Sequence, residues 1–161
     1  MQKLWQLQVD WDESLPIQYH THWSNFRDEL PKLNHFSVPR HLFDNCENPT
    51  NIQLHGFADA SEKAFGAVIY VRAEIQNSIC VRLLCSRSRV APLKKTTLPR
   101  LELCAAQLLA TLSSKILQFI NFKINSVHLW SDLTIVLNWI NSPSAKWKTY
   151  VANRVSDIQS H

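Results

Sequence analysis

The sequence predicts an α/β domain in which a mixed β-sheet is flanked by helices. Three runs typical of strands come first, and the short links between them favour antiparallel hairpins. A long helical pattern then separates the third run from a fourth strand, and two further helical segments follow. A strand, a crossover helix and another strand imply that the fourth strand joins the sheet in parallel, with helices packed on it.

Length and composition indicate a globular chain with its own core. The chain has 161 residues, of which 45% are hydrophobic and 19% are charged, a balance typical of folded rather than disordered proteins. No apolar run approaches the ~20 residues that a membrane-spanning helix requires, and the N-terminus lacks the apolar core of a signal peptide. We therefore expect an intracellular protein, cytoplasmic or nuclear, without a membrane partner.

The first 50 residues differ in character from the rest of the chain. They are punctuated by proline and rich in aromatic residues. A helix is predicted over residues 17–30, ending at Pro31, and a cluster of turn residues at 48–51 marks a boundary. We expect residues 1–50 to form a connecting segment and residues 51–161 to form the main domain.

Local patterns place the elements of the main domain. The second strand is a continuous apolar run over residues 65–71, which should be buried on both faces. The long helix should begin near Pro99, where a missing backbone N–H is harmless, and end at Phe119. The other predicted elements are strands over 52–59, 79–86 and 127–131 and helices over 133–140 and 147–159.

Three carboxylates stand at unusual places in this pattern. Asp59 ends the first strand, where an aspartate would also suit a turn. Glu102 lies in the first turn of the long helix, where a negative charge is favourable, but its helical face continues through Ala105 and Leu109 toward the core. A glutamate buried there should have a cationic partner. Asp132 follows the fourth strand, where it would also cap the next helix.

Considered together, these carboxylates predict a metal site. The first and fourth strands can be neighbours, and the long helix packs across them, so that Asp59, Glu102 and Asp132 would meet near the strand ends. Like charges this close raise one another's pKa unless a cation neutralises them. Oxygen ligands suit Mg²⁺ or Mn²⁺, and two such ions about 3.5–4 Å apart catalyse phosphodiester cleavage. We expect the three residues to be catalytic metal ligands.

Positive charge is concentrated between residues 72 and 100. This stretch has seven basic residues and one acidic residue, a net charge of +6 in a chain whose net charge is +4. Such a stretch suits a polyanionic partner, although a solvated strand edge and loop would have the same composition. We expect phosphate contacts from Arg87, Arg89, Lys94 and Lys95. Trp130 and Trp139 are expected in the core rather than as platforms for stacking bases.

Several segments resemble the ribonuclease H domain in Pol polyproteins of Bel/Pao-type LTR retrotransposons: GFADASEKAFGAVIY, KKTTLPRLELCAAQLLATL and VHLWSDLTIVLNWI. The segments LQVDWDESLP and RDELPKLNHFSVPRHL resemble the part that joins reverse transcriptase to ribonuclease H. The resemblance implies a ribonuclease H-like fold, hydrolysis of the RNA strand of RNA–DNA hybrids during reverse transcription, and the reverse transcriptase domain of the same polyprotein as a partner. The family's first three acidic metal ligands fall on Asp59, Glu102 and Asp132.

The sequence departs from the family pattern at its C-terminal end. In the family a fifth strand follows the helix at residues 147–159, and a fourth acidic residue comes after that strand. Asp157 lies on the preceding helix and does not match this motif, so the resemblance implies a domain without its last strand and helix. The alternative function is therefore a catalytically inactive remnant that acts as a scaffold or nucleic-acid-binding module.

Overall fold

The computed structural model describes residues 4, 6–43, 49–75 and 78–161, which fall into two compact units, Met1–Val38 and Pro39–His161. The first unit contains helix α2 (Ile17–Glu29), followed by the 3₁₀ helix η1 (Leu30–His35). The predicted helix over residues 17–30 is thus confirmed to within one residue at its end. None of the residues of α2 is buried.

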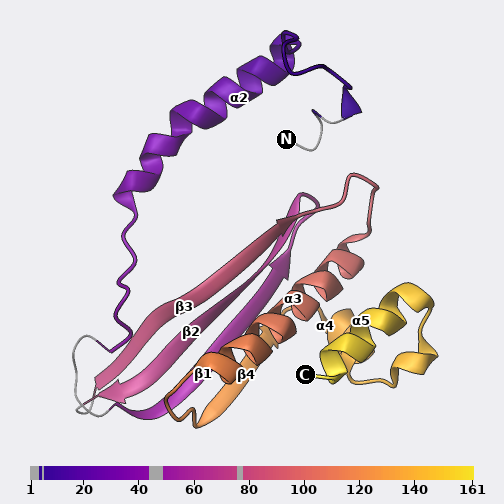
Figure 1. The fold of residues 1–161 in the computed structure, drawn as a ribbon. Coiled ribbons are helices and arrows are strands. Elements are labelled where there is room, and N and C mark those ends of the chain that lie inside the picture. Colours follow the sequence, from indigo (N-terminus) through magenta and orange to yellow (C-terminus); the bar gives the residue numbers. More distant parts are fainter. Residues whose placement is uncertain (1–3, 5, 44–48, 76–77) are drawn as a thin grey trace. The chain divides into compact units, whose positions relative to one another are not determined.

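The second unit is built on a four-stranded mixed sheet with the strand order β3-β2-β1-β4 (Figure 1). Strands β1 (Thr50–Ala60), β2 (Ala64–Ile75) and β3 (Ser78–Val90) form an antiparallel meander. Strand β4 (Ser126–Ser131) pairs with β1 in parallel. The predicted fold class is confirmed, and so is the prediction that the first and fourth strands are neighbours.

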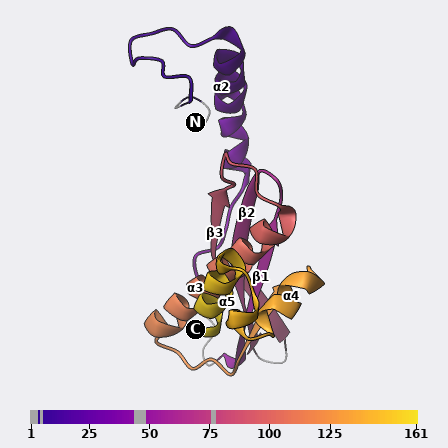
Figure 2. The ribbon, with the colours of Figure 1, turned by 90° about the vertical axis from the view of Figure 1, so that its right-hand side faces the viewer.

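The helices of this unit lie on one side of the sheet in both views (Figures 1 and 2). Helix α3 (Leu98–Phe119) crosses β1 and β2, and the core between them contains Leu54, Ile69 and Leu109. A second apolar cluster joins α3 to the helices that follow β4. These are α4 (Thr134–Ile140), the short 3₁₀ helix η2 (Ser144–Lys146) and α5 (Thr149–Gln159). No helix among the described residues has the length and hydropathy needed to cross a bilayer.

Only one face of β2 is fully buried, so the prediction of burial on both faces is wrong. Ala67, Ile69, Val71, Ala73 and Ile75 are buried, whereas the residues between them are partly exposed. The reason is that the described helices cover one face of the sheet, and antiparallel strands tolerate a solvated second face.

The two tryptophans expected in the core have different environments. Trp139 packs in the apolar cluster of α3, α4 and α5, as predicted. Trp130 lies on β4 with 54% of its surface exposed, so its predicted burial is wrong. Its ring is nearly parallel to that of Phe57 on β1, with 6.5 Å between ring centroids. An uncovered sheet face with aromatic residues is therefore a feature of this fold.

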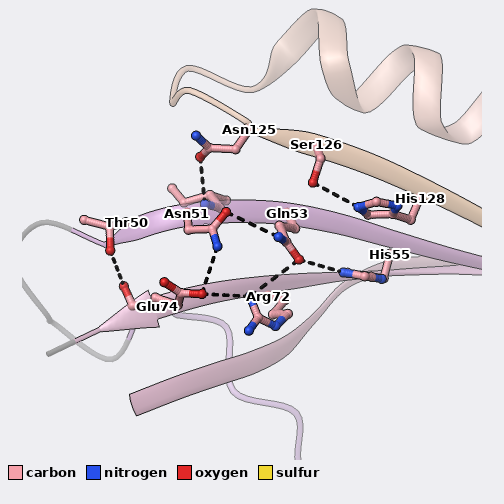
Figure 3. Close-up of polar contacts among 10 residues, drawn as sticks. Thr50, Asn51, Gln53, His55, Arg72, Glu74, Asn125, Ser126 and His128 are labelled. Carbon is pink, nitrogen blue, oxygen red and sulfur yellow. Dashed lines mark hydrogen bonds and ion pairs between the residues drawn. The ribbon is translucent and has the colours of Figure 1, made fainter. Parts of the chain in front are cut away.

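A polar network holds the end of the sheet where β1 begins (Figure 3). Asn125, just before β4, accepts a hydrogen bond from the backbone N–H of Ile52 at 2.9 Å. Asn51 donates to Glu74 at 2.8 Å, and Glu74 also pairs with Arg72 at 3.3 Å. Of the predicted turn cluster at 48–51, Asn48 lies outside the described residues. Thr50 and Asn51 belong to β1, and Asn51 has a positive φ of 46° where the ladder register shifts.

Candidate metal centre and nucleic-acid interface

Asp59 extends beyond the part of β1 that pairs with β4, which ends at Ala58. The turn after β1 is organised by Ser61, whose Oγ accepts hydrogen bonds from the backbone N–H groups of Lys63 at 3.3 Å and Ala64 at 3.2 Å. The Asp59 carboxylate accepts a hydrogen bond from the adjacent N–H of Ala60 at 2.8 Å. Because Ser61 supplies the turn contacts, the turn does not account for an aspartate at position 59.

Asp132 directly follows Ser131, the last residue of β4. Helix α4 begins at Thr134 with Leu133 as its N-cap, and no side chain makes the capping hydrogen bond. The alternative role of Asp132 as a helix cap is therefore not realised. Because β1 and β4 are parallel, their carboxyl ends meet at the same edge of the sheet, which brings Asp132 beside Asp59.

Glu102 approaches this edge from the helix. Helix α3 begins at Leu98 and has no acidic residue in its first turn, so Glu102 lies in the second turn rather than in the first as predicted. Its face of the helix continues through Ala105, Ala106 and Leu109, all of them buried. Glu102 itself is only 4% exposed. The predicted inward orientation of this glutamate is confirmed.

The three carboxylates lie together at one end of the sheet. One oxygen from each of Asp59, Glu102 and Asp132 can be chosen so that all three lie within 4.8 Å of one another. The two aspartates are exposed and the glutamate is buried. The cluster thus has an accessible side formed by strand ends and a buried side formed by the helix.

The electrostatics of Glu102 test whether a cation fits this cluster. Burial raises its pKa above the ordinary value, and the negative charges of Asp132 and Asp59 raise the pKa further, while a hydrogen bond with the backbone of Ala60 acts in the opposite direction. The Oε2 atom of Glu102 is buried without a hydrogen-bond partner. No described cationic side chain supplies the expected ion pair. A cation would satisfy this oxygen and offset the repulsion, so the cluster is compatible with a divalent metal ion.

The four predicted phosphate-binding residues lie on β3 and in the segment between β3 and α3, and all are exposed. On β3, Arg87 pairs with Ala67 and Arg89 pairs with Phe65, so their side chains extend from the helix-bearing face of the sheet. Lys94 and Lys95 lie nearer to α3. None of the four makes an ion pair among the described residues, which leaves their charges available to a polyanion.

A groove of about 480 Å³ opens beside Asp59 across β1, β2 and β3. Its lining includes Phe57, Gly66, Ser86 and Ser88, none of which was predicted to be functional. One signal for the groove was present in the sequence, because Gly66 is one of only two glycines and interrupts an apolar strand. A glycine inside a strand often marks close approach of a ligand or of another backbone.

Asp157 lies outside the carboxylate cluster. It sits on α5 and accepts a hydrogen bond from Nε2 of Gln107 on α3 at 2.7 Å. This contact joins the two helices. Among the described residues, the cluster that could hold a metal ion consists of the three carboxylates at positions 59, 102 and 132.

A comparison with protein-family models agrees with the resemblance seen in the sequence. A family model described as the Pao retrotransposon-like RNaseH-like domain matches residues 1–133, which include the three carboxylates and the four basic residues. No curated protein matches the chain. Among solved structures, the chain is similar to the crystal structure of the NurA nuclease from Sulfolobus solfataricus, with 12% sequence identity and a TM-score of 0.42. That alignment covers 98% of this chain and 54% of the nuclease, so the chain spans about half of that protein's length.

Proposed function

The chain belongs to the Pao retrotransposon-like RNaseH-like family, and we propose that it is a metal-dependent nuclease that hydrolyses the RNA strand of RNA–DNA hybrids during reverse transcription. The observation that carries this proposal is the carboxylate cluster of Asp59, Glu102 and Asp132 at the end of two parallel strands. A buried glutamate with an unpartnered oxygen, beside two exposed aspartates, has no structural role that the surrounding residues explain.

The three residues would hold Mg²⁺ or Mn²⁺ ions in a two-metal site, with Glu102 as the ligand on the buried side. When bound, such ions activate water for attack and stabilise the leaving oxygen of the phosphodiester. The exposed carboxylates of Asp59 and Asp132 face the side from which a phosphate can approach. Their fixed positions at strand ends keep the ligand oxygens preorganised, which lowers the reorganisation needed during the reaction.

The basic residues would hold the hybrid by its backbone. Arg87, Arg89, Lys94 and Lys95 would neutralise phosphates on the helix-bearing side of the strand edge, a contact without sequence preference. In the same proposal, residues 1–50 connect residues 51–161, the ribonuclease H-like domain, to the reverse transcriptase domain of the same polyprotein. The activity would belong to an intracellular retroelement particle or to the nucleus.

Cleavage of an end-labelled RNA–DNA hybrid in Mg²⁺ tests the proposal. The wild-type chain should cut the RNA strand, EDTA should stop the reaction, and Asp59→Asn and Asp132→Asn should each lower the cleavage rate by about 10²- to 10³-fold. Glu62→Gln is a matched control, because Glu62 is an exposed acid close to Asp59 in sequence that does not belong to the cluster. If a folded wild-type chain binds the hybrid but does not cut it, the alternative function as a catalytically inactive scaffold or nucleic-acid-binding module is the correct one.

A further inference from the structure

Ser131, the last residue of β4, faces the helix-bearing side of the sheet. The residue before it, Trp130, stacks with Phe57 on the uncovered face, and side chains alternate between the two faces along a strand. In the parallel ladder Ser131 pairs with Ala58, which is buried. Its side chain therefore extends into the layer between the sheet and α3, directly before Asp132.

Two buried polar atoms at this end of the sheet lack a hydrogen bond. Within the described part of the chain, neither Oγ of Ser131 nor Oε2 of Glu102 has a partner. The two residues are close in space, because Asp132 follows Ser131 and has a carboxylate oxygen within 4.8 Å of one from Glu102. Buried side-chain oxygens in native proteins nearly always have a partner. Two unpaired atoms on one side of the same strand end therefore require an explanation.

The chemistry of the two unpaired atoms is complementary. A serine hydroxyl can donate a hydrogen bond, whereas an ionised carboxylate can only accept. The backbone of Ala60 also interacts with Glu102, but its N–H donates to Asp59 at 2.8 Å. No described cationic side chain pairs with Glu102. The Ser131 hydroxyl is thus a buried donor without an acceptor, on the side of the sheet from which Glu102 approaches.

A carboxylate that holds a metal ion through one oxygen leaves its other oxygen to a hydrogen-bond donor. Such donors fix the orientation of the ligand, and their removal typically lowers metal affinity 10- to 100-fold. Glu102 needs a donor of this kind more than the two aspartates do, because its carboxylate is buried and cannot be solvated in the same way.

We propose that Ser131 is a positioning residue of the metal centre, whose hydroxyl donates a hydrogen bond to Oε2 of Glu102 when that carboxylate takes up a divalent cation. This inference rests on the proposed function, because it takes the three-carboxylate cluster as the metal centre. Rotation about the Cα–Cβ bond of Ser131 gives the hydroxyl three staggered positions. A hydrogen bond to an ionised carboxylate is stronger than one between neutral groups.

A purely structural role for this hydroxyl makes a different prediction for the metal-free chain. If the hydroxyl supported the fold, Ser131→Ala would leave a buried partner unsatisfied and would lower the stability. Because Oγ of Ser131 has no partner among the described residues, we expect Ser131→Ala in EDTA to unfold at the wild-type temperature or above it.

The test is a titration of Mn²⁺ into the full chain without nucleic acid, for the wild type, Ser131→Ala and Ser131→Thr. We expect Ser131→Ala to weaken Mn²⁺ affinity about 10- to 100-fold. Ser131→Thr keeps the hydroxyl, suits a strand, and should bind close to wild type. Ser113→Ala is the matched control, because it removes another buried hydroxyl without a partner, roughly 16 Å farther along α3 than Glu102. It should bind Mn²⁺ like the wild type.

A double-mutant cycle checks that Ser131 acts through Glu102. Ser131→Ala should weaken Mn²⁺ binding further in an Asp59→Asn chain, because the glutamate is still present there. The same substitution should add little in a Glu102→Gln chain, since two residues that share one contact do not have additive effects.

Equal Mn²⁺ affinity in the wild type and Ser131→Ala would overturn the positioning role and leave the nuclease proposal intact. The role would also be refuted by Ser131→Thr binding as weakly as Ser131→Ala, or by Ser131→Ala unfolding at a lower temperature in EDTA. A wild-type chain that binds no Mn²⁺ would refute the metal centre together with this role. If Mn²⁺ binding depends on Ser131 in a chain that never cuts a hybrid, the role stands and the nuclease activity is refuted.

Discussion

Ala58 on β1 lies directly opposite Ser131 on β4 in parallel register, and an aspartate follows each of them. This single pairing fixes the relative positions of Asp59 and Asp132. The two carboxylates come from segments that are more than 70 residues apart in the chain, yet they leave the sheet at the same end. Glu102 then completes the cluster from α3, the helix that connects the two strands through the crossover.

Asp132→Asn should therefore lower the rate of hybrid cleavage by about 10²- to 10³-fold, the usual effect of removing one preorganised electrostatic contact from an active site. The amide has nearly the same size as the carboxylate, and Asp132 makes no capping contact, so the fold should persist. Single-turnover rates and circular dichroism of the same samples check both parts. A variant that is well folded and cleaves at the wild-type rate would contradict the assignment of Asp132.

Glu102→Gln should stabilise the chain in the absence of divalent ions. The carboxylate is buried with an unpartnered oxygen beside two negative charges. The neutral amide removes the repulsion from the two aspartates and the cost of burying a charge, so the free energy of unfolding should rise by about 1–3 kcal/mol. Urea unfolding in EDTA at neutral pH measures the difference. A destabilised Glu102→Gln variant would mean that the carboxylate has a stabilising partner in the folded chain.

Gly56→Ala should destabilise the fold. A Cβ at this position would lie 2.7 Å from Cδ1 of Leu109 on α3 and 2.8 Å from Cδ2 of Leu129 on β4. Leu129 is 46% exposed and can move aside, but Leu109 is only 3% exposed, and displacing its side chain in a packed core costs about 1–3 kcal/mol. Gly66→Ala is the matched control on the neighbouring strand, since its nearest contact is 3.4 Å. Equal unfolding free energies for the two variants would contradict the close contact between Leu109 on α3 and Gly56 on β1.

The pair of histidines on β1 and β4 predicts how stability depends on pH. His55 and His128 stack with 4.9 Å between ring centroids. Burial lowers the pKa of His55 below its ordinary value, and the charges of His128 and Arg72 lower the pKa further. Glu74 is the ion-pair partner of Arg72 and so lies on the same side of His55 as that arginine. Protonation of His55 is therefore less favourable in the folded chain than in the unfolded chain.

The sign follows from proton linkage. Above the ordinary histidine pKa both states are neutral at this position, and the contribution of His55 to stability is constant. As the pH falls through that pKa, the unfolded chain takes up the proton first, so the free energy of unfolding decreases until the lowered folded-state pKa is passed. His55→Phe keeps a ring against His128 and should lose less stability between pH 8 and pH 5 than the wild type. Parallel curves in urea unfolding would exclude this role for His55.

Arg87→Ala/Arg89→Ala should weaken hybrid binding and make it less sensitive to salt. Each lost phosphate contact should reduce the slope of log K against log[salt] by about 1. The same loss is expected for RNA–DNA and DNA–DNA duplexes, because phosphate contacts do not read the sugar. Lys115→Ala, which removes an exposed charge farther along α3, serves as the control. An unchanged salt slope in the double arginine variant would place the phosphate contacts elsewhere.

The sequence predicts the parts of this architecture that depend on local patterns and chain connectivity. The strands ending near Asp59 and Asp132 and the inward face of Glu102 follow from strand and helix periodicity, and their meeting follows from the crossover between parallel strands. The exposure of Trp130 could not be predicted in this way. An apolar strand residue looks the same in sequence whether a helix covers its face of the sheet or leaves it open.

The groove depends on register, which the sequence leaves undetermined. Asp59, Gly66 and Ser88 form one row across three strands only because two hairpins pair in one particular alignment. A shift by one residue in either ladder would exchange the faces of all the side chains on the shifted strand. The sequence also does not predict that Ser61 organises the turn after β1 or that Leu133 is the N-cap residue of α4. Which residue organises a turn or begins a helix is decided by local geometry among several acceptable candidates.

The most direct test of the metal centre is a titration of Mn²⁺ into the wild-type chain and into Glu102→Gln at neutral pH. Isothermal titration calorimetry measures the affinity, and differential scanning calorimetry measures the unfolding temperature. Glu102→Gln keeps the size of the side chain and should leave the fold intact, so it isolates the contribution of the buried carboxylate. The account predicts that Mn²⁺ binds the wild type, raises its unfolding temperature, and loses most of its affinity in the variant. Equal Mn²⁺ affinity in the two proteins would contradict the assignment of this cluster as a metal centre.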